Sequence, residues 1–364
     1  MNSVKRIMSI LFFATMTLLL VACGGGGSGT SGIIVPTAPA APVSINAANA
    51  KLISADVLGT LDIVVGFLLV GDVLPAAQVD VAGSEFGYPD FFVQQLRRLP
   101  EMDISASDIN VVGAVIPPTR EPCDNPGGTM TISGDVAVIL PEWDPRIGDQ
   151  ITIQFEECEL AGIILNGKMA MTITDLAGDF VNEVPPYTLG LDVVLTTLSV
   201  EAGGEIAYAD GDISMLLDED ALGFETLIFS GNSLTAWGGG EVETLTDYWY
   251  YTTLTADLTY TYELEGKLAS TVIGGSVSFQ MIRPGSIGMP AVPFTGNDGF
   301  DPREGELWIT TSADASGSRT AAEVDSFTVY IDVYSDVSND MIIANIRTNW
   351  PELEACLLDP DVCS

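Results

Sequence analysis

Apolar and polar residues alternate with a period of two along most of the chain after about residue 110. The clearest case is 250–265, where Tyr250 and Leu258 fall on one side and Asp257 and Glu263 on the other. This alternation is typical of a β-strand with one buried and one solvated face. Runs of the same kind cover 128–132, 136–140, 150–155, 163–173, 188–200, 224–230, 268–280, 306–311, 326–333 and 341–350.

Glycine next to aspartate or asparagine recurs between these runs, which is typical of tight hairpin turns. Consecutive hairpins predict an antiparallel meander. We therefore expect a mainly β fold, with a large curved antiparallel sheet or half-open barrel covered by one to three N-terminal helices. The pairs and triplets that predict the turns are Gly134-Asp135, Gly148-Asp149, Asn166-Gly167, Gly178-Asp179, Asp210-Gly211-Asp212 and Gly231-Asn232.

The pattern before residue 110 is helical rather than alternating. Residues 46–73 are rich in alanine, leucine and valine and contain no proline, which predicts one or two helices that are apolar on nearly every side and therefore buried. A transmembrane span is the alternative reading of this segment, but the acids Asp56, Asp62 and Asp72 disfavour it. Residues 88–100 predict a further short amphipathic helix.

The first residues have the parts of a secretory signal: positive charges at Lys5 and Arg6, an apolar stretch over 7–20, and the sequence Leu20-Val21-Ala22-Cys23. This sequence resembles the lipobox of bacterial lipoprotein precursors. The resemblance implies that residues 1–22 are removed and that Cys23 carries fatty acyl chains such as palmitate. An ordinary cleaved signal peptide is the alternative.

The residue after Cys23 is Gly24, not aspartate. In Gram-negative members of the lipoprotein family, this implies transfer to the outer membrane, so we expect a lipid-anchored outer-membrane protein of the cell envelope; which face of that membrane it occupies stays open. Residues 23–43 are a Gly-, Ser- and Pro-rich tether. Residues 44–109 form the helical segment, and 110–364 form the β region, which we expect to make one domain with the helices.

The chain is strongly acidic. It has 13 Lys and Arg against 50 Asp and Glu, a net charge of −37. This charge excludes nucleic acid as a partner and disfavours binding to anionic lipid headgroups, so a covalent anchor is the expected route to the membrane. Because 47% of the residues are hydrophobic, the acids must cover a substantial apolar core.

Five cysteines are present. If Cys23 carries lipid, four remain in an exported protein, which is the setting for two disulfides. We predict that Cys123 pairs with Cys158 and Cys356 with Cys363. A metal site is the weaker alternative, because the chain has no histidine and no Cys-x-x-Cys pair.

The absence of histidine also excludes Ser-His-Asp and Cys-His catalysis, His-dependent zinc proteases and imidazole haem ligation. No Ser-x-x-Lys sequence in the mature chain and no nucleotide-binding fingerprint is present. A pair of carboxylates, as in glycoside hydrolases, is the one enzymatic device left open. Enzymatic activity is thus uncertain, and a binding role is preferred.

One acidic loop has the hard oxygen ligands and close spacing that calcium prefers. An acidic loop in an acidic protein is also commonly just solvated, and the spacing does not match an EF-hand. A second group of this kind is Asp332, Asp336, Asn339 and Asp340. The first, which is the candidate calcium site, comprises Asn297, Asp298, Asp301, Glu304 and Glu306.

Aromatic residues gather at 237–251. An exposed set of rings could stack on sugars or hold a partner, whereas rings alternating along a strand are more often packed in the core or across strands. We prefer packing. The residues concerned are Trp237, Tyr248, Trp249, Tyr250 and Tyr251.

Together these patterns predict a lipid-anchored, non-enzymatic binding or structural module of the cell envelope, with an envelope protein, glycan or lipid as partner. Two alternatives remain: a carrier of an apolar or acylated ligand in a groove between helix and sheet, and a carboxylate-dependent hydrolase. In architecture alone, the expected fold is similar to bacterial lipoproteins that shuttle acylated cargo. A spanning outer-membrane barrel is a further option that the lipobox disfavours.

Overall fold

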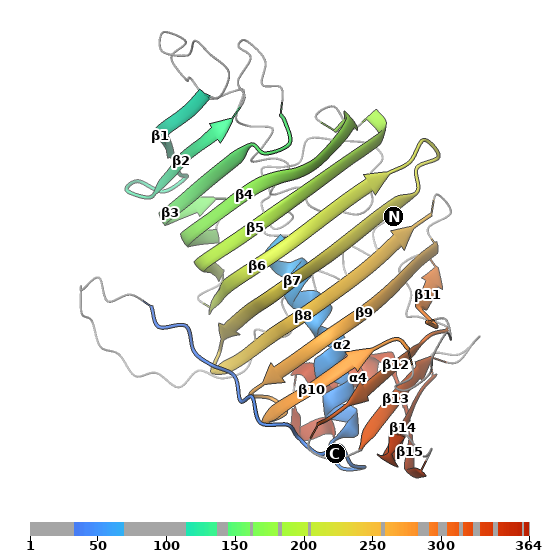
Figure 1. The fold of residues 1–364 in the computed structure, drawn as a ribbon. Coiled ribbons are helices and arrows are strands. Elements are labelled where there is room, and N and C mark those ends of the chain that lie inside the picture. Colours follow the sequence, from blue (N-terminus) through green and yellow to red (C-terminus); the bar gives the residue numbers. More distant parts are fainter. Residues whose placement is uncertain are drawn as a thin grey trace.

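The protein is mainly β and is built around one large antiparallel sheet, which does not close into a barrel (Figure 1). We analysed it as a computed structural model. The part of the chain that it describes comprises 33–68, 114–136, 145–160, 163–180, 184–202, 205–255, 259–282, 291–297, 304–312, 316–322, 328–337, 341–358 and 360–363.

The strands follow one another across the sheet almost in chain order, which confirms the predicted antiparallel meander. The exception is β11, which pairs with the first part of β9 while β10 pairs with the second part. The strands within the described ranges are β1 (Ala114–Pro122), β2 (Thr129–Val136), β3 (Gln150–Leu160), β4 (Ile163–Asp179), β5 (Val184–Ala202), β6 (Glu205–Glu219), β7 (Glu225–Gly238), β8 (Glu241–Leu254), β9 (Thr259–Ser270), β10 (Gly275–Gln280), β11 (Phe294–Asn297), β12 (Glu306–Thr310), β13 (Gly317–Ala322), β14 (Thr328–Asp336) and β15 (Met341–Asn349).

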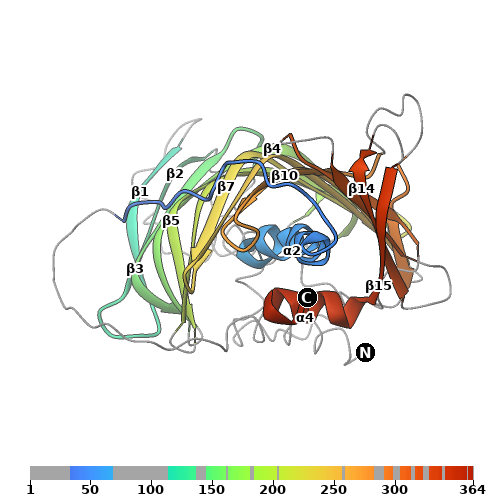
Figure 2. The same ribbon diagram turned by 90° about the horizontal axis from the view of Figure 1, so that it is seen from below.

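The sheet curves strongly, and its concave face holds the core. Figure 2 shows helix α2 (Ala50–Leu68) inside the curve, with α4 (Trp350–Leu358) beside it at the opening. Most buried apolar residues of the strands point to this side. One row across three neighbouring strands is Phe229, Tyr250 and Leu264, each no more than 2% exposed. The alternating pattern in the sequence therefore indicates which residues face the concave side of the sheet.

Helix α2 lies within the predicted helical stretch 46–73, and its side chains over 50–60 are buried or partly buried, as the composition predicts. No helix within the described ranges is both long and apolar enough to cross a bilayer. The predicted helix at 88–100 lies outside the described residues.

Helix α4 and the 3-10 turn η5 (Pro360–Cys363) were not expected inside the β region. Their start does carry a local signal. Asn349 Oδ1 accepts a hydrogen bond from Glu352 N–H at 2.9 Å, and the Glu352 carboxylate accepts one from Asn349 Nδ2 at 2.9 Å. This reciprocal arrangement is close to a capping box, which begins helices.

Several of the predicted turns are wrong, because the glycine pairs concerned lie inside long strands. Asn166-Gly167 lies within β4, Asp210-Gly211-Asp212 within β6 and Gly231-Asn232 within β7; Gly134-Asp135 likewise lies inside β2. In β4 and β6 the pairing shifts at these points, which marks β-bulges. Gly148-Asp149 and Gly178-Asp179 do border strand ends.

The bulges follow each other across the sheet and are stabilised by side chains. Glu157 and Thr197 have positive φ angles of 49° and 43°. Their backbone N–H groups donate to Asn166 Oδ1 at 2.7 Å and to Asp210 Oδ2 at 2.9 Å. Because a bulge bends its strand, a series of them in neighbouring strands contributes to the curvature of the sheet.

Two predicted strands are each divided in the structure. The run 250–265 is the end of β8 and the beginning of β9, and Thr255 N–H donates to Thr259 O at 2.9 Å across the connection. The run 268–280 is likewise divided between β9 and β10. Apolar and polar residues continue to alternate through both connections, so the period-two pattern alone does not show where one strand ends and the next begins.

The described part of the predicted tether is bound to the body of the protein. Pro42 forms a parallel bridge with Ser276 of β10, Val43 N–H donates to Ser276 O at 3.2 Å, and Ser276 N–H donates to Ala41 O at 2.9 Å. Beyond this point Ile45 is buried, and its N–H donates to Ser316 Oγ at 3.0 Å. Figure 2 shows the segment crossing the ends of the strands before the chain enters α2.

Candidate functional site: the contact between helix α2 and the sheet

Helix α2 contacts the concave face through polar groups as well as apolar ones. Thr60 Oγ1 and the Tyr250 hydroxyl are 2.6 Å apart, and Thr320 Oγ1 on β13 donates to Ser54 Oγ at 2.9 Å. Ser54, Thr60 and Thr320 are all fully buried. Buried hydroxyls of this kind fix one position of a helix, because moving the helix would leave them without partners.

A pair of carboxyl groups, one buried (Asp56) and one partly buried (Glu243), lies between these two contacts. Asp56 on α2 is 2% exposed and is hydrogen-bonded to Glu243 on β8 and to Ser270 on β9. Glu243 and Ser270 are directly opposite each other in the β8–β9 ladder. The second carboxyl oxygen of Asp56, Oδ2, is buried and has no hydrogen-bond partner within the described part of the chain.

Burial raises the pKa of Asp56 to about 6, and the negative charge of nearby Glu241 adds to this effect. Burial and the charge of Asp56 raise the pKa of Glu243 well above its usual value. Each carboxyl therefore keeps its proton to a higher pH than an exposed acid does, because a second negative charge in the same site would be repelled. Lys51 is a cation on the same helix, but its Nζ is paired with a different carboxylate, Glu352 Oε2 of α4, at 3.6 Å.

This pair does not have the geometry of a glycoside hydrolase. Such enzymes hold their two carboxyl groups about 5–9.5 Å apart, so that the sugar and a water molecule fit between them. Asp56 and Glu243 are hydrogen-bonded to each other, which leaves no room for a substrate between them. Their arrangement fits a structural link between helix and sheet.

A second acidic pair lies where β6 turns into β7. Glu219 and Glu225 are opposite each other in the ladder. Burial, and then the charge of Glu219, raise the pKa of Glu225 to about 7. Since the two residues close one hairpin, they too have a local structural explanation.

The predicted calcium site is only partly described. Asp298 and Asp301 lie outside the described residues. Glu304 pairs with Thr295 through its backbone, and Glu306 is 3.3 Å from Arg319 Nη1, so Glu306 is engaged with a cation of the protein itself. In the part of the chain that the structure describes, no group of three acids or cysteines has a geometry that could hold a metal ion.

The remaining candidate, Asn297, ends β11. In the second acidic group, Asp332 binds Arg319 and accepts a hydrogen bond from Asn345 Nδ2. Asn339 and Asp340 lie outside the described residues. Calcium binding therefore stays a prediction that rests on the sequence.

The aromatic residues at 237–251 divide between the two faces of the sheet. Tyr248 and Tyr250 are buried on the concave face. Trp249 and Tyr251 lie on the other face, stacked at 5.8 Å with an interplanar angle of 8°, and Trp237 stacks in the same way on Tyr208 at 5.1 Å. Each of these rings has one of its flat faces covered by a neighbouring ring of the same sheet. This favours the interpretation that the rings pack on each other.

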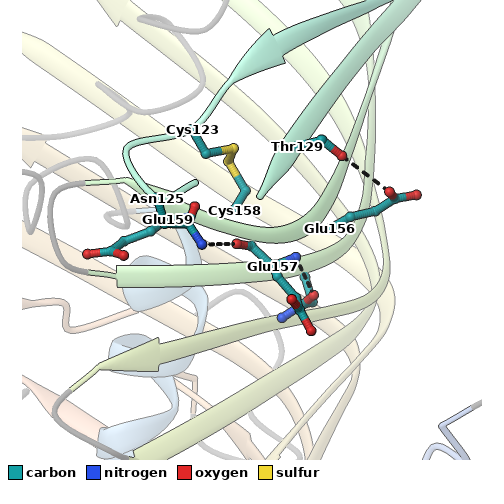
Figure 3. Close-up of a disulfide and its surroundings, with 8 residues drawn as sticks. Cys123, Asn125, Thr129, Glu156, Glu157, Cys158 and Glu159 are labelled. Atoms are coloured by element: carbon teal, nitrogen blue, oxygen red, sulfur yellow. Dashed lines mark hydrogen bonds between the residues drawn. A yellow bond between two sulfur atoms is a disulfide. The ribbon is translucent and has the colours of Figure 1, made fainter. Parts of the chain in front are cut away.

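The predicted cysteine pairs are both present. Cys123 and Cys158 are joined, with their Cα atoms 5.3 Å apart, and Cys356 is joined to Cys363, with a Cα separation of 5.1 Å. Figure 3 shows the first disulfide beside Asn125, which donates to Glu157 O at 2.8 Å and accepts from Glu159 N–H at 3.0 Å.

The predicted lipidation site, Cys23, lies outside the described residues. Glu243 was missed at the sequence level, and Asp56 was recognised only as an acid in an apolar helix. That acid was the available signal, since a carboxyl inside a buried helix needs a partner. No family model, no curated protein and no solved structure matches this chain.

Proposed function

We propose that the protein is a cell-envelope lipoprotein, anchored in the outer membrane through acylated Cys23, and that its β body acts by binding a partner rather than by catalysis. The lipobox sequence supports the anchor. The acidic surface supports it as well, because a body with this charge has no electrostatic attraction to anionic lipids.

The observation that carries the binding role is that concave-face side chains are buried along the described part of the sheet. Side chains on this face are buried not only beside α2 but also on the strands farther from it: Ile153, Met169 and Leu195 are each no more than 2% exposed. A carrier with an open apolar groove would expose such side chains to its ligand. A filled concave face leaves the outer surface and the sheet edges for interactions.

The anchor is tested by expressing the full chain in a Gram-negative host supplied with labelled palmitate. We expect label on the protein, recovery in the outer-membrane fraction, and a mature chain that begins at Cys23 by intact-mass measurement. In the matched Cys23→Ser variant, the label and the membrane association should both be lost. An unlabelled wild-type protein that is freely soluble would overturn the proposal.

The binding role is tested against the carrier by native mass spectrometry of the protein purified from membranes. A binding module with a filled core should show the mass of the polypeptide, its disulfides and its covalent lipid only. A carrier should show additional non-covalent acyl chains in a fixed ratio, and finding them would contradict a filled concave face.

A further inference from the structure

Two acids meet in the contact between α2 and the sheet, where neither is matched by a cation. Asp56 of α2 is hydrogen-bonded to Glu243 of β8 and to Ser270 of β9. Its Oδ2 is buried and has no hydrogen-bond partner among the described residues. A buried carboxylate is stable only when its oxygens accept hydrogen bonds or meet a cation. The site is therefore poorly suited to hold Asp56 and Glu243 when both are charged.

The groups that face the pair supply no positive charge within the described ranges. Glu241 on β8 adds a further negative charge to both acids. Lys51, the cation of α2, is paired with Glu352 of α4. The concave side chains of β14 are apolar. The other polar neighbours are the uncharged hydroxyls of Tyr250, Ser270 and Thr320.

We infer that the contact between Asp56 and Glu243 is a pH-dependent latch, which holds α2 against the sheet while a proton lies between the two carboxyls and releases the helix when both are ionised. With one proton present, one carboxyl donates a hydrogen bond to the other, so the contact is attractive. Without it, two negative charges face each other where water screens them poorly, and the same contact becomes repulsive.

The helix is the part that can move when the latch is charged. Glu243 lies on β8, which is hydrogen-bonded to β7 on one side and to β9 on the other. Helix α2 is linked to the sheet by side chains, at Ser54 and Thr60. No backbone hydrogen bond joins residues 50–60 to a strand in the part of the chain that the structure describes. Repulsion therefore displaces α2 rather than β8.

The start of α2 is fixed, which sets the direction of the movement. Ile45 N–H donates to Ser316 Oγ just before the helix begins. We therefore expect α2 to pivot about residues 46–49 toward the opening of the curve, on the side of α4 (Figure 2). This would uncover Tyr250 and its neighbour Phe229, which are 1% and 2% exposed while the latch is closed. The protein would then offer an apolar surface that depends on pH.

The latch opens as the pH rises. Burial raises the pKa of Asp56 to about 6, and burial together with the charge of Asp56 holds the pKa of Glu243 well above its usual value. Below about pH 6 the pair holds two protons, and it loses them in succession as the pH rises. The latch is therefore closed in acid, remains closed when the first proton is lost, and opens when the second is lost.

Thiol accessibility tests the latch in the full chain, with each cysteine assigned by peptide mass spectrometry. Ala55→Cys places a thiol on α2 at a site that is 1% exposed. Its alkylation rate is divided by that of Ile147→Cys, at a site that is 61% exposed, which corrects for ionisation of the thiol itself. We expect this ratio to rise by about tenfold between about pH 5 and about pH 9.

A thiol on a distant strand separates release of the helix from loss of the whole fold. Met169 is 0% exposed on β4, four strands along the sheet from β8. The corresponding ratio for Met169→Cys should stay low over the same pH range. Hydrogen exchange of the unmodified chain makes the same comparison without new thiols: residues 50–60 should lose protection while residues 163–173 keep it.

A second pair of variants tests which acid is responsible. Combined with Ala55→Cys, Asp56→Asn should abolish the pH dependence of the ratio, because asparagine does not ionise and its amide can donate to Glu243 in either state. Glu225→Gln is the matched control. Burial raises the pKa of Glu225 to about 7, but this residue lies at the β6–β7 hairpin, so the pH dependence should persist.

Three results would overturn the inference: a ratio at Ala55→Cys that does not change with pH, a rise that Met169→Cys shares, or a rise that persists in Asp56→Asn. The latch goes beyond the proposed function and depends neither on the lipid nor on a partner. Acylation of Cys23 is measured separately, so failure of the latch and failure of the anchor are distinguishable.

Discussion

At the scale of single residues, the pair of Asp56 and Glu243 couples folding to pH. The pKa of Asp56 rises from 3.8 to about 6 on folding, so the folded state holds a proton that the unfolded chain has released. Stability supplied by this proton is complete below about pH 4 and is lost as the pH rises through about 6.

We therefore predict that Asp56→Asn flattens part of the pH dependence of unfolding. Between about pH 4 and about pH 7, the free energy of unfolding of the wild type should fall by about 1–3 kcal/mol relative to the variant, since asparagine is neutral throughout. Urea unfolding at a series of pH values measures this difference. Asp135→Asn, at an exposed site in β2, is the control, and parallel curves for wild type and Asp56→Asn would contradict the prediction.

Gly167 in the β4 bulge is a second position at which the structure requires one particular residue type. Its φ is +101°, and a Cβ there would lie 2.3 Å from Thr197 O. Gly240 has a similar φ of +97° but open space around it. Both substitutions to alanine should cost about 1 kcal/mol through backbone strain, and Gly167→Ala a further 1–3 kcal/mol, roughly, through overlap. Equal midpoints in thermal unfolding would show that the bulge can relax.

At the level of single residues, the sequence predicted contacts correctly where only a few pairings were possible. Four cysteines allow three pairings, and the sequence order of Cys123, Cys158, Cys356 and Cys363 already favoured the observed one. The link from Asp56 to Glu243 spans nearly 190 positions between a helix and a strand, and nothing local in the sequence connects them. Only the packing of α2 on β8 and β9 brings the two acids together.

At the scale of elements, the two disulfides close loops of very different length. The residues joined are 35 positions apart in one case and 7 in the other. Because a longer closed loop restricts the unfolded chain more, Cys123→Ala with Cys158→Ala should cost about 4 kcal/mol, and Cys356→Ala with Cys363→Ala about 2 kcal/mol. Urea midpoints of the two double variants measure the order, and the reverse order would contradict it.

The elements themselves were predicted unevenly. Period-two alternation correctly indicated strands, the turn residues between the runs correctly indicated an antiparallel meander, and the apolar, proline-free stretch 46–73 correctly indicated the helix at Ala50–Leu68. It could not separate a turn from a bulge, because Asn166-Gly167 offers the same positive φ and the same side-chain acceptor to both. Only the partner strand decides, and that information is not local. Helix α4 was obscured because the apolar run of β15 continues directly into Trp350.

At the scale of the whole molecule, the net charge opposes compaction. With −37 distributed over the surface, self-repulsion should weaken the folded state at low ionic strength. We predict that the thermal midpoint rises between about 0.01 M and about 1 M NaCl, as the screening length falls from about 30 Å to about 3 Å. An unchanged or falling midpoint in calorimetry would contradict this. The shielded Asp56–Glu243 pair should contribute little to the change.

The course of residues 38–45 has a mechanical consequence. A pull on the amino-terminal end of the chain reaches the hydrogen bonds at Ser276 before it reaches α2, so β10 takes up the tension and the helix stays seated. The 15 peptide units from Cys23 to Ala38 extend to about 50 Å at most. If Cys23 is held in a bilayer, the body of the protein can therefore lie no farther than this from the membrane at the point where residues 41–43 bind Ser276.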